Sequence, residues 1–261
     1  METETRGTPV GFFAAGRSPT CLLVHGFTAS AEEMRFLGER LAQSGRQVVG
    51  VQLAGHGTRV EHLARTSWQD WYHSVRGPLF ALASPQEPAV LISQSLGGLL
   101  ALWAAARHPE RVGALVLLAP AIQLRARWLS LVRPILPALA RWRTSWPKGE
   151  SDIADPEARR QRVGYTEIPL AALAQLLELQ RHVRRVLRDV RQPVLLFQSV
   201  QDHTCSWRGV ERLEASLSGP LEIERLQQSF HVLSVDVERE AIAERIARFL
   251  AQFAPPLGRD R

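Results

Sequence analysis

Short apolar runs alternate with segments of helical period along most of this chain, and this alternation limits the folds open to it. The runs that read as buried strands are residues 20–24, 47–53, 89–92, 113–118, 193–199 and 221–226. The segments with apolar residues at helical spacing are residues 30–44, 67–82, 96–107, 170–188, 206–217 and 237–253. Ser30 and Glu33 predict a capping box at the start of the first of these helices. Strand–helix alternation predicts an α/β fold with a mostly parallel central sheet and helices on both faces.

The alternation is interrupted between residues 121 and 188, where no clear strand is visible before a long helical run. We therefore expect a core made of residues 1–120 and 189–261, and an inserted helical cap, or lid, made of residues 121–188. Ligands of open α/β sheets bind at the carboxyl ends of the strands. An insertion after the strand that ends at Leu118 would cover that edge and line a pocket there.

Composition and charge exclude several classes of protein. The chain is 45% hydrophobic and 22% charged, which rules out a disordered, collagen-like or coiled-coil chain. The net charge of +6 comes from 31 Arg and one Lys, Lys148. Because Arg and Glu alternate, as in residues 238–240, we expect this charge on a solvated surface and predict no nucleic-acid partner.

Cysteine content and the composition of the first residues give an expectation for the cellular compartment of the protein. Cys21 and Cys205 are expected as free thiols in a reducing compartment, with a single disulfide as the alternative. Residues 1–7 are polar and acidic and lack the apolar run of a secretory signal. No stretch has the roughly 18 apolar residues of a spanning helix. These features predict a cytoplasmic protein.

Ser95 is the candidate nucleophile. A strand leads into it and an apolar helix begins directly after it. Such a tight strand-to-helix turn lifts a serine hydroxyl above the sheet edge and requires small residues two positions before and after the serine. Gly97 meets this requirement, and Ser93 stands where the usual Gly-x-Ser-x-Gly motif has its first glycine. The alternative is a serine that only caps the helix.

A serine hydroxyl needs a base that takes its proton and an acid that orients the base. His231 follows the last strand and Asp202 follows the preceding one, so both lie on loops at the edge where Ser95 lies. His203, next to Asp202, is a rival base. Asp236 is a rival acid, although its place before the last helix favours a helix N-cap.

Acyl transfer also requires donors for the negative charge that develops on the carbonyl oxygen. The backbone N–H of Leu96 opens a helix, where the helix dipole favours negative charge. The backbone N–H of Phe27 follows Gly26, whose flexibility lets the chain turn toward the serine. We expect these two groups to form an oxyanion hole.

Six stretches in order carry a resemblance to a known family: residues 25–28, 55–58, 65–71, the turn around Ser95, residues 201–203, and residues 229–232 with Asp236. With them the chain resembles the α/β-hydrolase superfamily over nearly its whole length, and within it bacterial monoacylglycerol lipases and small carboxylesterases. The resemblance implies the same nucleophile, acid and base, Ser95, Asp202 and His231, and the same oxyanion donors, Phe27 and Leu96.

Residues and resemblance together predict a serine hydrolase that cleaves carboxylic esters through an acyl-enzyme, with no cofactor and no metal. Its substrate would be a small ester or a monoacylglycerol. The alternatives are a thioesterase or lactonase with the same triad, and a non-catalytic ligand-binding relative. No polar residue of the insertion can be matched to the glycerol site of monoacylglycerol lipases, so acyl-chain length and alcohol stay open, as does the oligomeric state.

The first part of the insertion is rich in Leu, Trp and Pro. Its interspersed arginines are Arg125, Arg127, Arg133, Arg141 and Arg143. Basic and aromatic residues together are typical of lipid interfaces, which predicts a weak contact with a lipid surface. The alternative is that the apolar side chains pack on the sheet edge and the arginines are only solvated.

Overall fold

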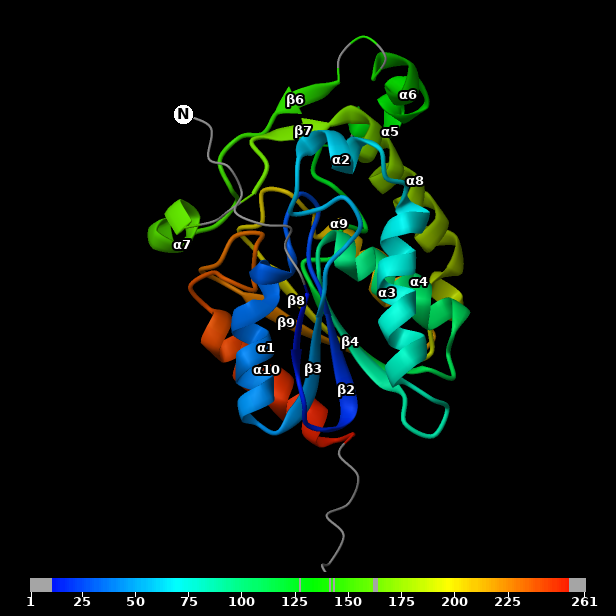
Figure 1. The fold of residues 1–261 in the computed structure, drawn as a ribbon, viewed down its shortest axis with the longest axis vertical. Helices are drawn as coiled ribbons and strands as arrows, with labels where there is room; N and C mark the ends of the chain where they lie inside the picture. Colours follow the sequence, from blue (N-terminus) through cyan, green and yellow to red (C-terminus); the bar gives the residue numbers. More distant parts are fainter. Residues whose placement is uncertain (1–10, 127, 141, 143, 162–163, 254–261) are drawn as a thin grey trace, which may run out of the picture.

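The computed structural model describes residues 11–126, 128–140, 142, 144–161 and 164–253. A seven-stranded sheet in the order β1-β3-β2-β4-β5-β8-β9 forms the centre of this part of the chain (Figure 1). β1 pairs antiparallel with β3, and all the other neighbours pair in parallel. The strands are β1 (Phe12–Ala14), β2 (Arg17–Val24), β3 (Arg46–Val51), β4 (Ala89–Gln94), β5 (Val112–Leu118), β8 (Val194–Ser199) and β9 (Leu221–Leu226).

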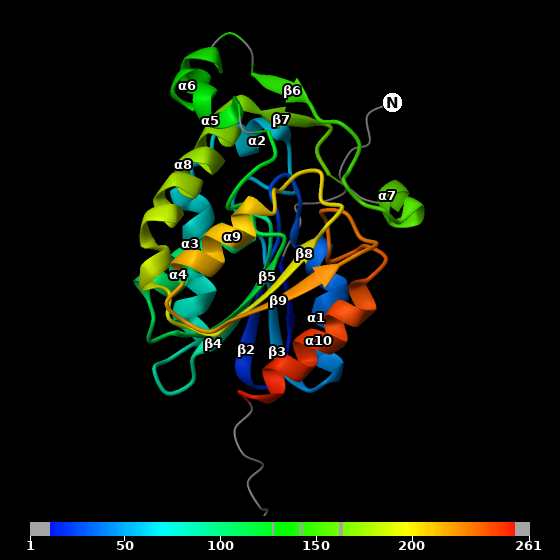
Figure 2. The same cartoon turned by 180° about the vertical axis from the view of Figure 1, so that it is seen from behind.

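Helices cover both faces of the sheet, as Figures 1 and 2 show from opposite sides. On one face, α1 (Arg35–Gln43) and α10 (Arg239–Ala251) bury apolar side chains in one core cluster with alternate residues of the strands. On the other face, a larger core cluster includes residues of α3 (Trp68–Leu82), α4 (Leu96–Arg107), α8 (Leu170–Val186) and α9 (Arg208–Ser216). The predicted α/β fold, a mostly parallel sheet with helices on both faces, is therefore confirmed.

Local sequence patterns predicted some ends and caps of the helices and strands correctly and others wrongly. The bounds of α4 and β9 agree with the prediction. The capping box predicted at Ser30 is wrong, because the Ser30 side chain makes no cap bond and Glu33 accepts the N–H of Gly26 instead. A capping box does form at α3, where the Ser67 side chain accepts the N–H of Asp70 and Asp70 accepts that of Ser67.

Residues 121–188, which we call the insertion, connect β5 and β8, two neighbouring strands of the sheet. Its elements are α5 (Trp128–Val132), a 3₁₀ turn (Arg133–Ile135), α6 (Leu136–Leu139), β6 (Ser145–Pro147), α7 (Pro156–Gln161), β7 (Glu167–Pro169), α8 and the start of a 3₁₀ turn (Leu187–Asp189). β6 and β7 pair antiparallel, so the reading that this segment holds no strand is wrong. Arg127, Arg141, Arg143 and the side chain of Arg133 lie outside the described residues, as do residues 1–7.

The insertion lies at the end of the molecule where β4 gives way to Ser95, at the top of Figure 1. α8 differs from the rest of the insertion, because it packs along α3 and α4 and buries residues such as Leu176 and Leu179 in the larger core. Of the short elements before it, α5, α6, β6 and β7 lie above the strand ends together with α2 (Val60–Ala64), whereas α7 lies to one side.

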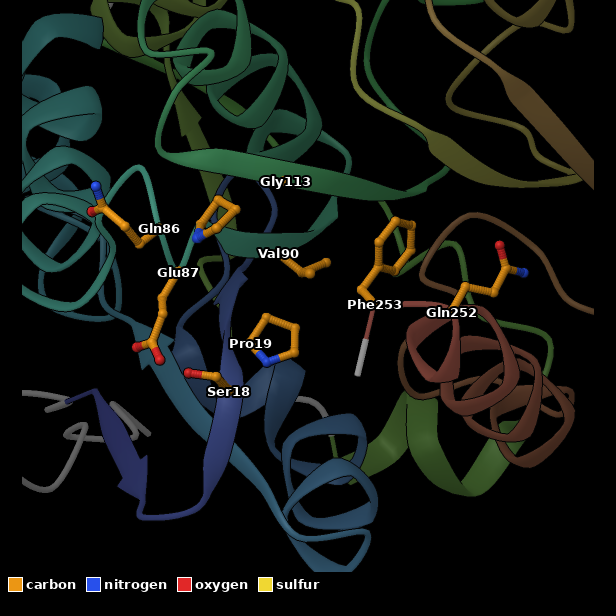
Figure 3. Close-up of a pocket in the computed structure, with 9 residues that line it drawn as sticks. Ser18, Pro19, Gln86, Glu87, Val90, Gly113, Gln252 and Phe253 are labelled. Carbon is orange, nitrogen blue, oxygen red and sulfur yellow. The ribbon is translucent and has the colours of Figure 1, made fainter. Parts of the chain in front are cut away.

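A cavity of about 410 Å³ opens at the other end of the sheet (Figure 3). It is lined by Ser18, Pro19, Gln86, Glu87, Pro88, Val90, Gly113, Gln252 and Phe253. Val90 and Gly113 stand near the amino ends of β4 and β5, whereas Ser95 follows the carboxyl end of β4. The cavity is therefore separate from the candidate site described next.

Candidate active site

The turn from β4 into α4 holds Ser95 in a strained backbone conformation. Its φ is 53° and its ψ is −108°, in the region that side chains other than glycine rarely adopt. The chain must pass close to β2 here, because a Cβ on Gly97 would lie 2.3 Å from the carbonyl oxygen of Val24. At the other position, the Ser93 hydroxyl donates to the carbonyl of Val116 at 3.2 Å, so a serine fits where the motif usually has glycine.

The three side chains predicted to work together lie in one hydrogen-bonded chain. Nε2 of His231 lies 3.0 Å from Oγ of Ser95, and Nδ1 of His231 lies 3.0 Å from Oδ2 of Asp202. Ser95 follows β4, Asp202 follows β8 and His231 follows β9, so three parallel strands deliver them to one sheet edge. All three are buried, Asp202 almost completely.

The carboxylate of Asp202 and the imidazole of His231 each stabilise the charged form of the other. Burial alone would raise the pKa of Asp202, but the nearby His231 and the hydrogen bonds to the carboxylate hold that pKa below its ordinary value. The bonds to Oδ1 come from the N–H groups of Thr204 at 2.8 Å and Cys205 at 2.7 Å, and Gln198 donates to Oδ2 at 2.7 Å. Burial opposes charge on His231 as well, yet the Asp202 carboxylate raises the pKa of His231 well above 6.5.

Backbone N–H groups are available beside Ser95. Leu96 is the first residue of α4, so its N–H has no partner within the helix. Among the described residues, neither this N–H nor that of Phe27 donates a hydrogen bond. Phe27 follows Gly26, on which a Cβ would lie 3.4 Å from the Cβ of Ser95. The turn that carries Phe27 therefore passes directly beside the serine.

Two buried histidines shape the turn that carries Phe27. Nδ1 of His25 lies 2.8 Å from the Gly26 carbonyl, and Nε2 accepts the N–H of Leu53 at 3.2 Å. Burial lowers the pKa of His25 to about 4, so it is neutral and its two nitrogens keep these separate roles. The ring of His56 packs edge-on against that of Phe27, with centroids 5.9 Å apart.

Neither rival from the sequence joins the chain of hydrogen bonds. His203 has a side chain that is 64% exposed, and its Nδ1 lies 2.7 Å from Oδ1 of Asp152. Asp236 is fully buried but does not cap α10, whose N-cap residue is Glu238. The N-cap reading of Asp236 is thus wrong: its carboxylate accepts the backbone N–H groups of Ala154, Asp155, Phe230 and Val237.

The two cysteines are free thiols, as predicted, and both are buried. In the described part of the chain, one group of His, Cys and acidic side chains has ligand atoms within 4.8 Å of one another: Asp202, Cys205 and His231. Two of these three are already hydrogen-bonded to each other. No helix of the described segments combines the length and the apolar character needed to cross a membrane.

Residues that sequence reasoning missed support the site from the insertion. The backbone carbonyl of Asp152 accepts the N–H of His231 at 3.0 Å, and its side chain accepts from His203 and Thr204. Nζ of Lys148 donates to Oγ1 of Thr28 at 2.6 Å. No local pattern marks Asp152, whereas Lys148 stands out as the one lysine of the chain.

Two known proteins are similar to this chain over nearly its whole length. The chain is 31% identical over 253 residues to a thermostable monoacylglycerol lipase from Bacillus sp. (strain H-257), covering 93% of this chain and 94% of that protein. It is 23% identical over 245 residues to a carboxylesterase from Bacillus subtilis (strain 168), covering 93% and 96%.

Solved structures show the same fold. One, from work on the metagenome-derived lipolytic enzymes LipS and LipT, superposes with a TM-score of 0.84 at 27% identity and covers 96% of this chain and all of that one. The Paleococcus ferrophilus monoacylglycerol lipase superposes with a TM-score of 0.81 at 19% identity, covering 94% and 99%. The family described as "Serine aminopeptidase, S33" matches residues 17–238. The chain belongs to this family and has the α/β-hydrolase fold.

Proposed function

We propose that this protein is a serine hydrolase that cleaves carboxylic esters, with Ser95 as nucleophile, His231 as base and Asp202 as orienting acid. One observation carries the proposal: two 3.0 Å hydrogen bonds join these side chains in the order that proton transfer requires. The strained φ of Ser95 adds to it, because strain of this kind persists where the surrounding structure holds a functional side chain in place.

The mechanism follows from the positions of the atoms. Oγ of Ser95 attacks the ester carbonyl while Nε2 of His231 takes its proton. Asp202 stabilises the imidazolium that forms and keeps Nδ1 protonated. His231 then protonates the leaving alcohol, which frees an acyl-enzyme on Ser95. Water, deprotonated by the same histidine, attacks that acyl group and releases the acid.

The negative charge on the tetrahedral oxygen needs fixed donors. We infer that the N–H groups of Phe27 and Leu96 supply them, because both belong to turns that adjoin Ser95. Loss of one such donor costs on the order of 10²–10³ in rate in other acyl-transfer enzymes. Because these donors are backbone groups, Phe27→Ala keeps the N–H and changes mainly the pocket.

The substrate class is a small ester or a monoacylglycerol. The two relatives are named as a monoacylglycerol lipase and a carboxylesterase, so their names support both substrate classes and do not decide between these classes. Thioesters and lactones react by the same steps, so a panel of p-nitrophenyl esters, monoacylglycerols, acyl thioesters and lactones separates the alternatives. We expect the highest kcat/KM on an oxygen ester that is not a lactone. Higher values on thioesters or lactones would reassign the reaction.

The insertion acts in this proposal as a cap that lines the acyl pocket and touches lipid weakly. Large apolar side chains on its outer part are exposed: Trp128 by 51%, Leu131 by 79%, Ile135 by 58% and Trp142 by 92%. Flotation with phosphatidylcholine vesicles tests this contact, and Trp142→Ala should reduce it. Equal binding of both proteins would mean that this surface does not meet lipid. Cytoplasmic location remains a prediction from the sequence.

The test of the proposed function uses Ser95→Ala. We expect this variant to lose hydrolysis of p-nitrophenyl butyrate by at least about 10⁴-fold while its circular dichroism stays unchanged. Ser84→Ala, on the loop before β4 at the other end of the sheet, is the matched control and should keep full activity. Retained turnover in Ser95→Ala would refute the assignment.

A further inference from the structure

The chain contains one lysine, and the side chain of this lysine contacts the turn that lies beside Ser95, the proposed nucleophile. Against 31 arginines there is a single lysine, Lys148, in the insertion. It directly follows β6, and its Nζ donates to Oγ1 of Thr28 at 2.6 Å. Thr28 follows Phe27, whose N–H is a proposed oxyanion donor. The contact therefore joins the insertion to the turn on which that donor lies.

The lysine reaches this turn from a fixed backbone. The N–H of Lys148 donates to the carbonyl of Thr166 at 2.8 Å, which continues the pairing of β6 with β7. Leu170 in turn donates its N–H to the carbonyl of Thr144 at 3.0 Å, which ties the other end of this small sheet to the start of α8. The side chain thus extends from the end of a hydrogen-bonded two-stranded sheet rather than from a free loop.

Thr28 is a residue whose conformation needs support. Its φ is 60°, in the left-handed region that a β-branched residue rarely adopts, and it is 2% exposed. Strain of this kind persists only where neighbouring groups hold it. The side chain of Lys148 is one such group, because its ammonium fixes the hydroxyl of Thr28 by a charge-assisted hydrogen bond.

The insertion also holds a second turn, residues 55–58, which lies against Phe27. The hydroxyl of Tyr165 donates to the carbonyl of Gly55 at 2.7 Å and accepts the N–H of Thr58 at 3.0 Å. Between those two residues lies His56, whose ring packs against Phe27. Lys148 and Tyr165 together hold the surroundings of Phe27 from above.

We propose that Lys148 is a positioning residue, which holds the Phe27 N–H in the direction of the oxyanion through its hydrogen bond to Thr28. This inference rests on the proposed function. It also gives a physical reason for a lysine at this position in a chain whose other basic residues are arginines. A compact ammonium on a flexible stem can meet a single hydroxyl in a half-buried space, whereas the planar guanidinium fork is wider and suits paired acceptors.

The test compares Lys148→Met, Thr28→Val and the double variant with wild type on p-nitrophenyl butyrate. An oxyanion donor acts in the transition state, so each single variant should lower kcat by roughly 10-fold and change KM by less than about 2-fold. The double variant should be no slower than the slower single one, because both changes remove the same bond. Lys148→Arg should recover only part of the lost kcat.

A second measurement separates positioning from a merely structural role. A trifluoromethyl ketone forms a hemiketal oxyanion on the serine, so Lys148→Met should weaken its binding about as much as it lowers kcat. Arg160→Met is the matched control: it removes a positive charge from α7, where Arg160 pairs with Glu157 at the surface. This control should match wild type in both measurements.

The outcomes are distinct. Unchanged kcat in Lys148→Met, with ketone binding also unchanged, would overturn the proposal. So would a rise in KM confined to esters that carry an acidic group, since Lys148 would then bind substrate directly. If Lys148→Met does not fold, carbamylation of the folded wild type with cyanate replaces it, with Lys148→Arg as the protein that cannot be modified at this position. Failure of the proposed function itself would look different, because wild type would then neither cleave esters nor react with a fluorophosphonate.

Discussion

The backbone carbonyl of Asp152 accepts the N–H of His231 at 3.0 Å, so a residue of the insertion holds the main chain of the proposed base. The same carbonyl accepts the N–H of Val232 at 3.1 Å. The Asp152 carboxylate accepts the N–H of His203 at 3.0 Å and the hydroxyl of Thr204 at 2.8 Å, on the loop that follows Asp202. One residue thus links the loop of the base to the loop of the acid.

Asp236 holds the insertion against the loop that carries His231, and replacing Asp236 should weaken this contact. Its fully buried carboxylate accepts four backbone N–H groups, two from the insertion and one from Phe230, the neighbour of His231. Asp236→Asn places an amide donor against these donors. We expect the free energy of unfolding in urea to fall by about 2–4 kcal/mol, with a loss of kcat. Asp189→Asn, at an exposed position, is the control and should change neither. Unchanged stability of Asp236→Asn would contradict this account.

The sequence predicts those parts of the fold that are set by local pattern. The apolar composition of α4 and the short apolar runs of the parallel strands predicted the sheet and its two covered faces. The loops after those strands predicted the chain order of Ser95, Asp202 and His231. The parallel arrangement then required those loops to share an edge, which is why three distant residues could be assigned together.

Short elements that form only through tertiary contacts were not predicted from the sequence. β1 is three residues long and forms because Phe12 packs over Gly50, where a Cβ would lie 2.1 Å from the ring. β6 and β7 are equally short and exist only as each other's partner. The role of Asp236 was misread because an aspartate before a helix usually caps it, while the donors it accepts here come from residues far away in the sequence.

Gly97 is required by the close approach of two backbones, which makes it a sharp test of the turn at Ser95. A Cβ there would lie 2.3 Å from the carbonyl oxygen of Val24, so Gly97→Ala must shift α4 or β2 and with it the serine. We expect at least a 100-fold loss of kcat/KM and a destabilisation of about 2 kcal/mol. Gly149→Ala is the control, since a Cβ at that position meets nothing within 4 Å. Full activity of Gly97→Ala would contradict the described turn.

The pH dependence of kcat/KM should report the free base. His231 must be unprotonated to accept the serine proton, and the Asp202 carboxylate raises the pKa of His231 well above 6.5. Activity should therefore fall as pH drops through a midpoint that lies above 6.5. In Asp202→Asn the midpoint should move to lower pH, and the rate should fall by on the order of 10³–10⁴. A midpoint below 6.5 in wild type, or one that Asp202→Asn leaves in place, would contradict this pairing.

Stability should fall on mild acidification because two buried histidines are neutral in the folded protein. Burial lowers the pKa of His25 to about 4, and that of His56 lies well below 6.5. Unfolded histidines take up protons below about pH 6.5, so the stabilisation present above that pH is lost as pH falls toward 4. Between pH 6.5 and 5, His25 alone should lower the free energy of unfolding by about 2 kcal/mol.

This pH window separates the histidines from the other groups whose pKa is shifted. His231 has a raised pKa, so its contribution to stability is already complete below pH 6.5. Asp202 has a lowered pKa, so its contribution is lost only below about pH 4. Urea unfolding at several pH values measures the change. A free energy of unfolding that stays constant or rises from pH 6.5 to 5 would show that His25 and His56 are protonated in the folded state.

The most direct measurement maps the site and the reaction rate of a fluorophosphonate probe by mass spectrometry, in wild type and in His231→Gln. An activated serine is needed for this reaction, and activation is what the 3.0 Å contact between His231 and Ser95 would supply. We expect a single adduct on Ser95 in wild type and a labelling rate at least about 10³-fold lower in His231→Gln. An adduct on another residue, or a rate that does not depend on His231, would contradict the catalytic pairing of these two residues.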